Sequence, residues 1–403
     1  MQGAADTEAG DILRSTVAST LRRLGGTTFA RALQRREVDA QARAGSLMAE
    51  SGWTGVLVPE QFGGSALGVR AAATIAEELG RVALPAPFIA RCVLPAVLLA
   101  RSDSAEAHAA CIAGLASGTL KVVLAHDEAT HALERAEMKT TLSGRKNGLV
   151  LRGRKTLVAG ADSADCFIVA ARKGNDTALC LVPADAAGVT CRFEYAVDGT
   201  CFGAVEFSDA KVSDVLAVGA HADRLLARAR EYALTAASAE LYGVMSQALE
   251  MTLGYMRTRV QFGRPIGAFQ ALQHRAAELF VQKALAYSVV QEAIALIESG
   301  ADSRDELNAD SRDGWGADSR DGANAGSREI ALAVRRAKAR CSDAALRTTK
   351  DAVQLHGAIG YTDEYDISLY LKRAMVLASW LGNGVVQRRE YVRLAHVLGG
   401  EAA

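Results

Sequence analysis

The sequence Tyr-Met-Arg-Thr-Arg-Val-Gln-Phe-Gly-Arg-Pro-Ile-Gly-Ala-Phe-Gln occupies residues 255–270 and separates two strongly helical runs, residues 225–258 and residues 271–298. The glycines and proline of residues 262–267 predict a tight break, so that two long helices meet there. Arginines, aromatic rings and glutamines crowd this corner, and arginine is suited to bidentate contacts with phosphate. The corner therefore indicates either a site for an anionic ligand or a helix hairpin with a solvated basic end.

A second motif favours the first of these interpretations. Residues 351–365 read Asp-Ala-Val-Gln-Leu-His-Gly-Ala-Ile-Gly-Tyr-Thr-Asp-Glu-Tyr. In this order and at about this separation, the two motifs resemble those of the acyl-CoA dehydrogenase flavoproteins. Residues 52–64 and 76–80 are similar to the N-terminal helical domain of that family. The resemblance implies an FAD-dependent oxidoreductase that acts on the CH–CH bond of an acyl-CoA and passes its electrons to an acceptor.

Bulk properties restrict the partners of the chain. Its 403 residues contain 46 Lys and Arg against 46 Asp and Glu, a balance that argues against nucleic acid or an anionic membrane as the main partner. The 7 cysteines show no metal-ligand spacing, so we expect them to be reduced and expect no metal site. The N-terminus is polar and no apolar run reaches transmembrane length by inspection, which predicts a cytoplasmic protein.

The pattern of helical and β-branched runs along the chain predicts three domains. Residues 1–119 read as helices, residues 120–218 as short β-branched strands of a small barrel or sandwich, and residues 219–403 as a four-helix bundle. The last two bundle helices are expected at residues 327–356 and 366–397. A mostly α protein with a β middle domain matches the layout of the family.

Residues 301–328 do not fit the domain layout of the family. An eight-residue unit that begins Ala-Asp-Ser-Arg recurs there, and the unit is almost wholly polar. The oxygen-ligand order of a calcium loop is absent. We interpret the repeat insertion as a lengthened loop between two bundle helices, with no function of its own.

The resemblance assigns one group of residues to the cofactor of a neighbouring subunit. Arg259, Gln261, Phe262 and Gln270 would reach the FAD of the neighbour, and Gln354, His356 and Gly357 would lie along its ADP part. A guanidinium supplies a fork of donors, and glycine lets the backbone approach a phosphate closely. This group is present.

The catalytic base is missing from its usual place. The family carries a glutamate in a Tyr-Glu-Gly-Thr segment, and here Leu381 stands at that position and Asn383 replaces the threonine. Leucine has no atom that accepts a proton. Some members carry the base on the first bundle helix, where the matching residue is Ala233. Glu231 is two residues away, about 200° around a helix, and should face elsewhere. The catalytic residue is therefore unknown.

The residues that would contact the flavin ring in this family are also replaced. Where the family has a Trp-Ile-Thr strand beside the ring, residues 156–160 read Thr-Leu-Val-Ala-Gly, and Ala159 offers no hydroxyl. Contacts to the chain's own ring have gone, whereas contacts to a partner's FAD remain. This pattern resembles the base-lacking subunit of heteromeric acyl-CoA dehydrogenases, several of which act on steroid thioesters.

Three hypotheses follow from the sequence. The first is a subunit that is inactive without a partner chain that supplies the base. The second is a self-sufficient homo-oligomeric dehydrogenase with a relocated base such as Glu231 or Glu364. The third is a flavin-free scaffold or binding protein of the same fold.

Overall fold

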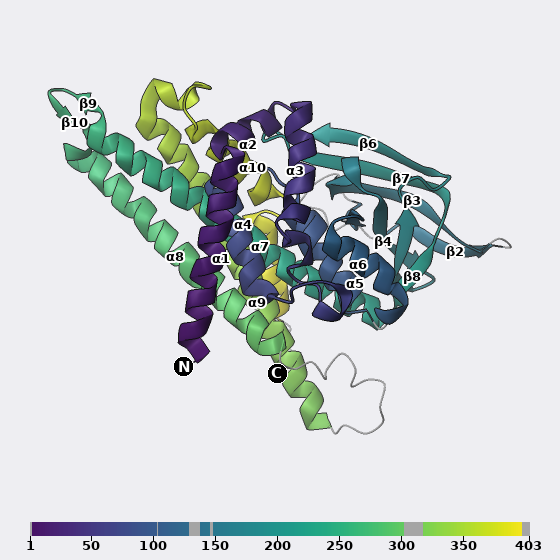
Figure 1. Cartoon of the computed structure of the whole chain (residues 1–403). Helices are drawn as coiled ribbons and strands as arrows, with labels where there is room; N and C mark the ends of the chain where they lie inside the picture. The colour runs from purple at the N-terminus through teal and green to yellow at the C-terminus, as the bar shows by residue number, and fades with distance from the viewer. Residues whose placement is uncertain (1, 103, 129–137, 146–147, 302–316, 397–403) are drawn as a thin grey trace. The chain divides into compact units, whose positions relative to one another are not determined.

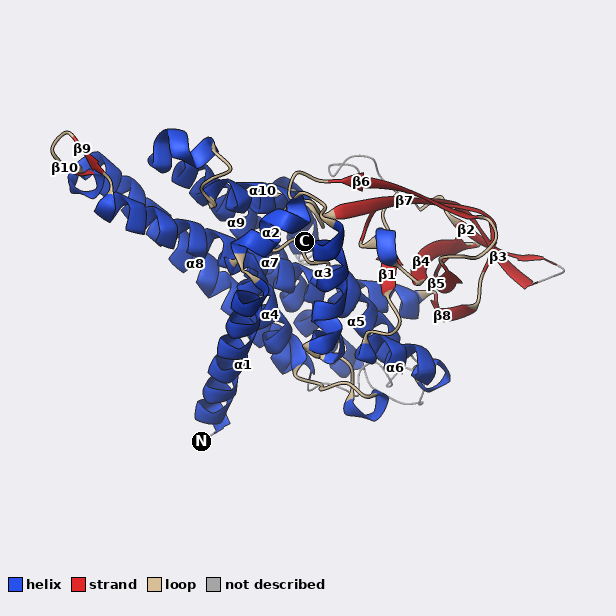
Figure 2. Ribbon diagram, turned by 45° about the horizontal axis from the view of Figure 1, so that its top comes forward, coloured by secondary structure: helices blue, strands red, loops and turns tan. Residues whose placement is uncertain are grey.

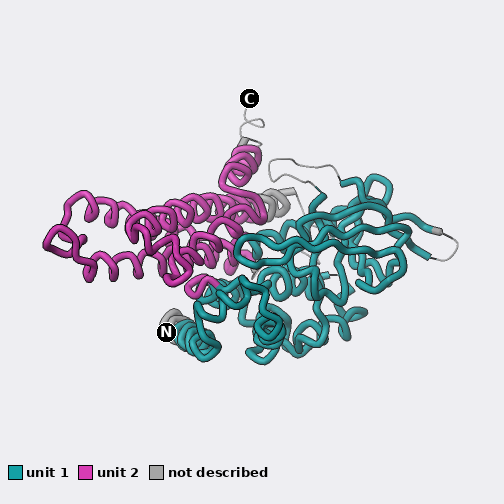
Figure 3. The backbone as a smooth tube through the Cα atoms, turned by 90° about the horizontal axis from the view of Figure 1, so that it is seen from above, with its two compact units in different colours: residues 1–79, 84–233 teal, residues 80–83, 234–403 magenta. Residues whose placement is uncertain are grey.

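A computed structural model describes residues 2–102, 104–128, 138–145, 148–301 and 317–396 (Figure 1). The chain divides into two compact units (Figure 3). Unit 1 contains residues 1–79 and 84–233, and unit 2 contains residues 80–83 and 234–403. Each unit is described by itself.

The N-terminal part of unit 1 is helical, as predicted. Its main helices are α1 (Gln2–Leu24), α2 (Thr27–Gln34), α3 (Val38–Glu50), α4 (Gly68–Arg81), α5 (Leu94–Ala100) and α6 (Ala109–Ser117). A π-helical turn, Ile89–Val93, leads into α5. Helix α4 shows how the pattern works, because Val69, Ala72, Ala76 and Leu79 recur at helical spacing and are all buried.

The β-domain of unit 1 is one mixed sheet. Its strands are β1 (Val122–Ala125), β2 (Thr141–Arg145), β3 (Gly148–Ala159), β4 (Cys166–Lys173), β5 (Asp176–Pro183), β6 (Val189–Tyr195), β7 (Cys201–Lys211) and β8 (Asp214–Val218). The order is β6-β7-β3-β2-β4-β5-β8, and β1 pairs with β4 in parallel (Figure 2). Residues 209–211 complete β7, and residues 214–218 form β8.

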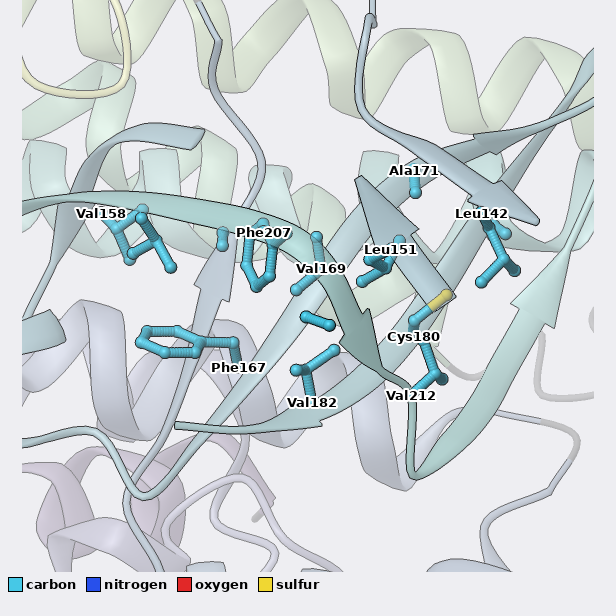
Figure 4. Packing of buried hydrophobic residues seen from close by; sticks show 14 of the residues in the cluster. Leu142, Leu151, Val158, Phe167, Val169, Ala171, Cys180, Val182, Phe207 and Val212 are labelled. Atoms are coloured by element: carbon cyan, nitrogen blue, oxygen red, sulfur yellow. The ribbon is translucent and has the colours of Figure 1, made fainter. Parts of the chain in front are cut away.

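The core of this domain lies on one face of the sheet (Figure 4). Phe167 and Phe207 meet edge to face with ring centroids 6.4 Å apart. Residues 167–171 of β4 are all buried, so this strand is covered on both faces and shows no polar alternation. The continuous apolar run therefore marks a central strand, and β4 indeed pairs with strands on both edges.

Unit 2 is helical, as predicted. It contains the part of α7 (Ala220–Thr258) from Leu234 onward, together with α8 (Gln270–Ala301), α9 (Ala317–His356), α10 (Ile367–Ser379) and α11 (Gly384–His396). The expected single helix over residues 366–397 is wrong, because the chain breaks between α10 and α11. There Leu381 and Gly382 both adopt positive φ, a conformation that ends a helix.

The expectation of a loop throughout residues 301–328 is also wrong in part. Residues 317–328, which hold the third and the degraded copies of the repeat, belong to α9. Residues 302–316 lie outside the described residues. A polar segment that has no apolar face can still be helical when it extends a helix that is already packed.

Helix α8 revises one expectation from the sequence. Over Gln270–Gly300 its mean hydropathy of 1.3 and its length meet the criteria for a membrane-crossing helix, and 28% of that window is buried. Core helices of soluble bundles meet the same criteria. One such helix is therefore weak evidence for a membrane span.

Candidate functional site

A two-residue hairpin forms the corner between α7 and α8. Strand β9 (Val260–Gln261) pairs with β10 (Arg264–Pro265), and the turn residues Phe262 and Gly263 have φ of 55° and 79°. Positive φ at both central positions is the geometry of a type I′ turn, which matches the twist of a hairpin. Glycine adopts this conformation freely, whereas phenylalanine is strained by it. The strained backbone of Phe262 thus lies where the sequence predicts contacts with a ligand.

The hairpin exposes the side chains that the sequence assigned to the cofactor. Arg259, Gln261, Phe262 and Gln270 are all exposed, and the ring of Phe262 is 90% exposed. The rings of Phe262 and Phe269 meet edge to face, with their centroids 6.1 Å apart. An aromatic ring this open to solvent has lost little of its hydration on folding and can still bury apolar area against a partner.

The second motif lies against the base of this hairpin within unit 2. The rings of His356 and Tyr255 stack with centroids 4.5 Å apart, and the centroid of the Tyr365 ring lies 4.8 Å from that of the histidine. The two motifs, about 100 residues apart in the sequence, are thus brought together by ring contacts. Gln354 is exposed, and Gly357 has a φ of 64° with no atom within 4 Å of the place where a Cβ would stand.

The side chain of His356 is buried rather than directed at solvent. Its Nδ1 lies 2.7 Å from the carbonyl oxygen of Ala352, and because a carbonyl only accepts, Nδ1 carries the proton. Its Nε2 is buried without a hydrogen-bond partner among the described residues. Burial lowers the pKa of His356, against a smaller opposing effect of the bond to Ala352.

The lowered pKa of His356 makes stability depend on pH. The unfolded histidine titrates near 6.5 and the folded one lower, so below about pH 6.5 the unfolded chain binds more protons. Stability should fall as the pH drops from 6.5 through the folded pKa, at most by about 1.4 kcal/mol per pH unit. His356→Phe, which keeps a ring between the tyrosines, should lose this component. The measurement is urea unfolding of both proteins at pH 7.5 and 5.5; an equal loss in both would contradict the assignment.

Leu381, which the sequence predicts to stand at the position of the missing base, lies in the connection between α10 and α11. The Leu381 carbonyl accepts a hydrogen bond from Gln387 Nε2 at 2.6 Å, and the Gly382 carbonyl accepts one from Lys338 Nζ at 3.2 Å. Asn383 caps α11, because its Oδ1 accepts from the amides of Val385 and Val386 at 3.1 and 3.0 Å. This connection is ordered by side chains, and it carries no proton acceptor at Leu381.

The first alternative base is already paired. Glu231 is 8% exposed, and its Oε2 lies 3.3 Å from Nη1 of Arg228 on the same helix. Ala233 is fully buried. Glu364, the other alternative, is exposed in unit 2. The ion pair with Arg228 gives the burial of Glu231 a structural explanation that needs no catalytic role.

The strand expected beside the flavin ring ends irregularly. The pairing of β3 with β7 shifts register between Lys155 and Val158, and Leu157 bulges outward with a φ of 52° and 44% exposure. Val158 and Ala159 are buried. No hydroxyl or indole stands in this segment from Leu157 to Gly160, as the sequence indicated.

Sequence reasoning missed an ion pair at the start of this segment. Lys155 is fully buried, and its Nζ lies 2.6 Å from Oε1 of Glu128 and 3.0 Å from the carbonyl oxygen of His126. Glu128 also accepts from the amides of Lys139 and Thr140. Partners this far apart in the chain leave no local signal. The pair ties the loop after β1 to the middle of β3.

Sequence reasoning also missed three residues beside Gln354. Arg275, Lys350 and Tyr361 line a common pocket with it in unit 2. Lys350 could have been found, because it precedes Gln354 by four residues on α9 and so shares its face. Among the described residues, no group of three or more His, Cys, Asp or Glu could hold a metal ion.

The chain thus combines an N-terminal helical part, a β-domain and a C-terminal group of helices with an exposed basic corner. Three family models match the chain: acyl-CoA dehydrogenase, N-terminal domain at residues 7–119, middle domain at 124–210, and C-terminal domain at 226–310 and 317–395. The chain belongs to the acyl-CoA dehydrogenase family, whose members are flavin-dependent oxidoreductases that act on CH–CH bonds.

The chain is also similar to a relative and, in its fold, to two solved structures. The chain is 29% identical over 384 residues to the acyl-CoA dehydrogenase IpdE2 of Mycolicibacterium smegmatis, covering 93% of this chain and 95% of the relative. It is similar to a steroid acyl-CoA dehydrogenase, Tcur3481-Tcur3483, at 24% identity with a TM-score of 0.80 over 99% of this chain and 100% of that one. It is also similar to the ChsE4-ChsE5 complex of Mycobacterium tuberculosis, at 23% identity with a TM-score of 0.78 over 96% of both chains.

Proposed function

We propose that this chain is the base-lacking subunit of an FAD-dependent acyl-CoA dehydrogenase and completes the FAD site of a partner subunit. The observation that carries the proposal is the contrast between Leu381, which cannot accept a proton, and the exposed group around Arg259, which is intact. A second family member would supply the base. Bound FAD supplies the acceptor for the β-hydride of the acyl group.

The exposed residues fit the cofactor they would hold. Among the described residues, the side chains of Arg259, Gln261 and Gln354 make no ion pair or hydrogen bond, so their donors are available. Arg259 would bind the diphosphate through its fork of donors, and the open backbone of Gly357 would admit a phosphate closely. Phe262 and Gln270 would bury the remaining surface of the nucleotide.

The printed names of two similar structures support a two-chain assembly. Tcur3481-Tcur3483 and the ChsE4-ChsE5 complex each combine two different designations, and the first is called a steroid acyl-CoA dehydrogenase. A further similar structure is titled an electron transferring flavoprotein of Acidaminococcus fermentans. By analogy, the substrate of this chain would be a bulky acyl-CoA, and its electrons would pass to a flavoprotein acceptor.

Turnover of the isolated chain tests the proposal. The pure chain should not oxidise any acyl-CoA with an artificial acceptor, because removal of the α-proton needs a base that it lacks. Adding a family member that has the glutamate in its Tyr-Glu-Gly-Thr segment should restore activity. The control is Glu231→Gln in the mixed complex, which should leave the rate unchanged.

Two outcomes would count against this function. Turnover by the pure chain that Glu231→Gln or Glu364→Gln abolishes would favour a self-sufficient dehydrogenase. A mixed complex that holds no flavin by its visible spectrum would favour a flavin-free scaffold.

A further inference from the structure

Strand β6 forms one edge of the sheet in unit 1. The strand order begins with β6, and its only strand partner among the described residues is β7 (Figure 2). Sheet edges are often protected by a proline, a lysine or a β-bulge, because their free backbone groups pair readily with another strand. Residues 189–195 read Val-Thr-Cys-Arg-Phe-Glu-Tyr, and their pairing with β7 has no register shift. This edge therefore carries none of these protections.

The pairing with β7 determines which residues present their backbone at the free edge. The amide of Ser208 donates to the carbonyl oxygen of Gly188 at 2.8 Å, and the amide of Ala196 donates to that of Thr200 at 2.9 Å. Hydrogen-bonded pairs recur at every second residue of an antiparallel ladder, so the even-numbered residues of β6 bond to β7. The backbone groups of the odd-numbered residues therefore point to the free edge: those of Cys191, Phe193 and Tyr195.

The free part of this edge ends at Tyr195. The next carbonyl that points outward is that of Val197, and it accepts a hydrogen bond from Nε2 of Gln34 at 2.9 Å. Cζ of Arg36 lies 4.9 Å from the centroid of the Tyr195 ring. Contacts with the chain's own residues thus begin where β6 ends, and the backbone before that point is left for another strand.

The two faces of β6 differ in character. Cys191 packs against the core of the β-domain, and the residues that continue its face, Phe193 and Tyr195, are 43% and 42% exposed. Half-exposed rings beside a free strand edge present apolar area that a further strand can cover. On the other face Arg192 and Glu194 are exposed, and within the described parts of the chain neither forms an ion pair. This face therefore holds one available charge of each sign.

We propose that β6 pairs edge to edge with β6 of a second copy of this chain, antiparallel, with the two-fold axis at Phe193. The outward backbone groups of Phe193 then bond to those of Phe193 in the second copy, and those of Cys191 bond to those of Tyr195. The same register places Arg192 opposite Glu194 of the second copy, and Glu194 opposite Arg192. These two pairs lack backbone bonds, so their Cα atoms are the closer ones, about 4.5 Å apart.

The charges select this register over its neighbours. An axis at Arg192 or at Glu194 would set two like charges directly opposite each other, which is destabilising. An axis at Cys191 or at Tyr195 would leave neither charge opposite a charged residue of β6. With the axis at Phe193 both charges are paired, and two-fold symmetry makes each of these pairs twice. The inference goes beyond the proposed function and does not rest on it, because none of these residues belongs to the predicted cofactor contacts.

Sedimentation velocity of the purified chain over a range of concentrations tests the pairing. Glu194→Arg sets arginines opposite each other at both symmetric positions, so dimerisation should weaken about tenfold or more. Arg192→Glu should weaken it similarly. The matched control is Asp185→Arg, which changes the net charge as Glu194→Arg does, at an exposed residue before β6. This control should leave the dissociation constant unchanged.

Mixing the two single variants separates the pairing from a loss of folding. In the mixed dimer, the two arginines of Glu194→Arg would face the two glutamates of Arg192→Glu. The variants should therefore associate with each other more tightly than either associates with itself. The double variant with Arg192→Glu and Glu194→Arg exchanges the two signs and should dimerise as the wild type does. A variant that fails to fold would recover in neither experiment.

A disulfide at the axis tests the register directly. Phe193→Cys should cross-link two copies under a mild oxidant, because bonded residues opposite each other in an antiparallel pair are about 5.5 Å apart at Cα, within disulfide reach. Thr190→Cys is the control, because its two copies would lie six residues apart along the strands, roughly 20 Å. Peptide mass spectrometry would identify which cysteines are joined.

Three results would overturn the proposal. One is equal dissociation constants for wild type, Glu194→Arg and Asp185→Arg, since association would then use another surface. Another is a mixture of the two charge variants that associates no better than either variant alone. The third is a wild-type chain that stays monomeric at every concentration measured. These readouts use neither flavin nor turnover, so failure of the base-lacking role would leave them interpretable.

Discussion

Glu240→Ala is expected to destabilise unit 2 by about 3–5 kcal/mol, because it leaves the Arg373 guanidinium buried without its counter-charge. The side chains are 1% and 4% exposed, and Arg373 Nε donates to Glu240 Oε1 at 2.8 Å across α7 and α10. Urea unfolding of the whole chain, followed by circular dichroism of its helices, measures the effect. A loss of this size exceeds what most single substitutions cause.

A second pair in the same unit provides the matched control. Arg388 and Asp343 form an ion pair whose side chains are 54% and 53% exposed. Because solvent screens exposed pairs, Asp343→Ala should cost at most about 1 kcal/mol. The double variant Glu240→Met with Arg373→Met should recover much of the stability, since it removes both charges together. Similar decreases in the free energy of unfolding for Glu240→Ala and Asp343→Ala would show that burial of the Glu240–Arg373 pair does not increase the effect of breaking it.

This pair also shows where sequence reasoning fails. A basic pair such as Lys372 and Arg373 usually indicates a solvated helix face, but Arg373 is 3% exposed. Its partner Glu240 is 133 residues away in the sequence, and no local sequence pattern predicts a contact at that separation. Lys155 and Glu128 were missed for the same reason. Periodicity reports which face of a helix is apolar, but it does not report which charge is neutralised by a distant element.

Local chemistry was read more successfully than long-range contacts. The corner at residues 259–270 was predicted from its glycines and proline, and the structure forms a hairpin there with Phe262 and Gly263 in the turn. The break at Leu381 and Gly382 was overlooked although Gly-Asn-Gly is a turn signal. The roles of Arg259, Gln354 and the other predicted cofactor residues stay predictions.

Arg259→Ala is expected to reduce FAD retention by the mixed complex about ten- to a hundredfold. The guanidinium is exposed at the hairpin, and among the described residues its side chain has no partner. A bidentate contact with a diphosphate is charge-assisted, and such hydrogen bonds contribute about 1.5–3 kcal/mol, each 1.4 kcal/mol being a factor of ten. The measurement is the flavin-to-protein ratio of complexes reconstituted with a base-bearing partner.

Two further variants make this experiment specific to the fork of donors. Arg259→Lys keeps the charge but loses the planar fork, so its flavin content should fall between wild type and alanine. Arg257→Ala removes an exposed charge two residues earlier on α7, outside the predicted contacts, and should retain flavin like the wild type. If long-range charge alone held the cofactor, Arg257→Ala would lose as much flavin as Arg259→Ala. Equal flavin content in all four proteins would mean that Arg259 does not touch the cofactor, and the role of this chain in a partner's FAD site would have to be abandoned.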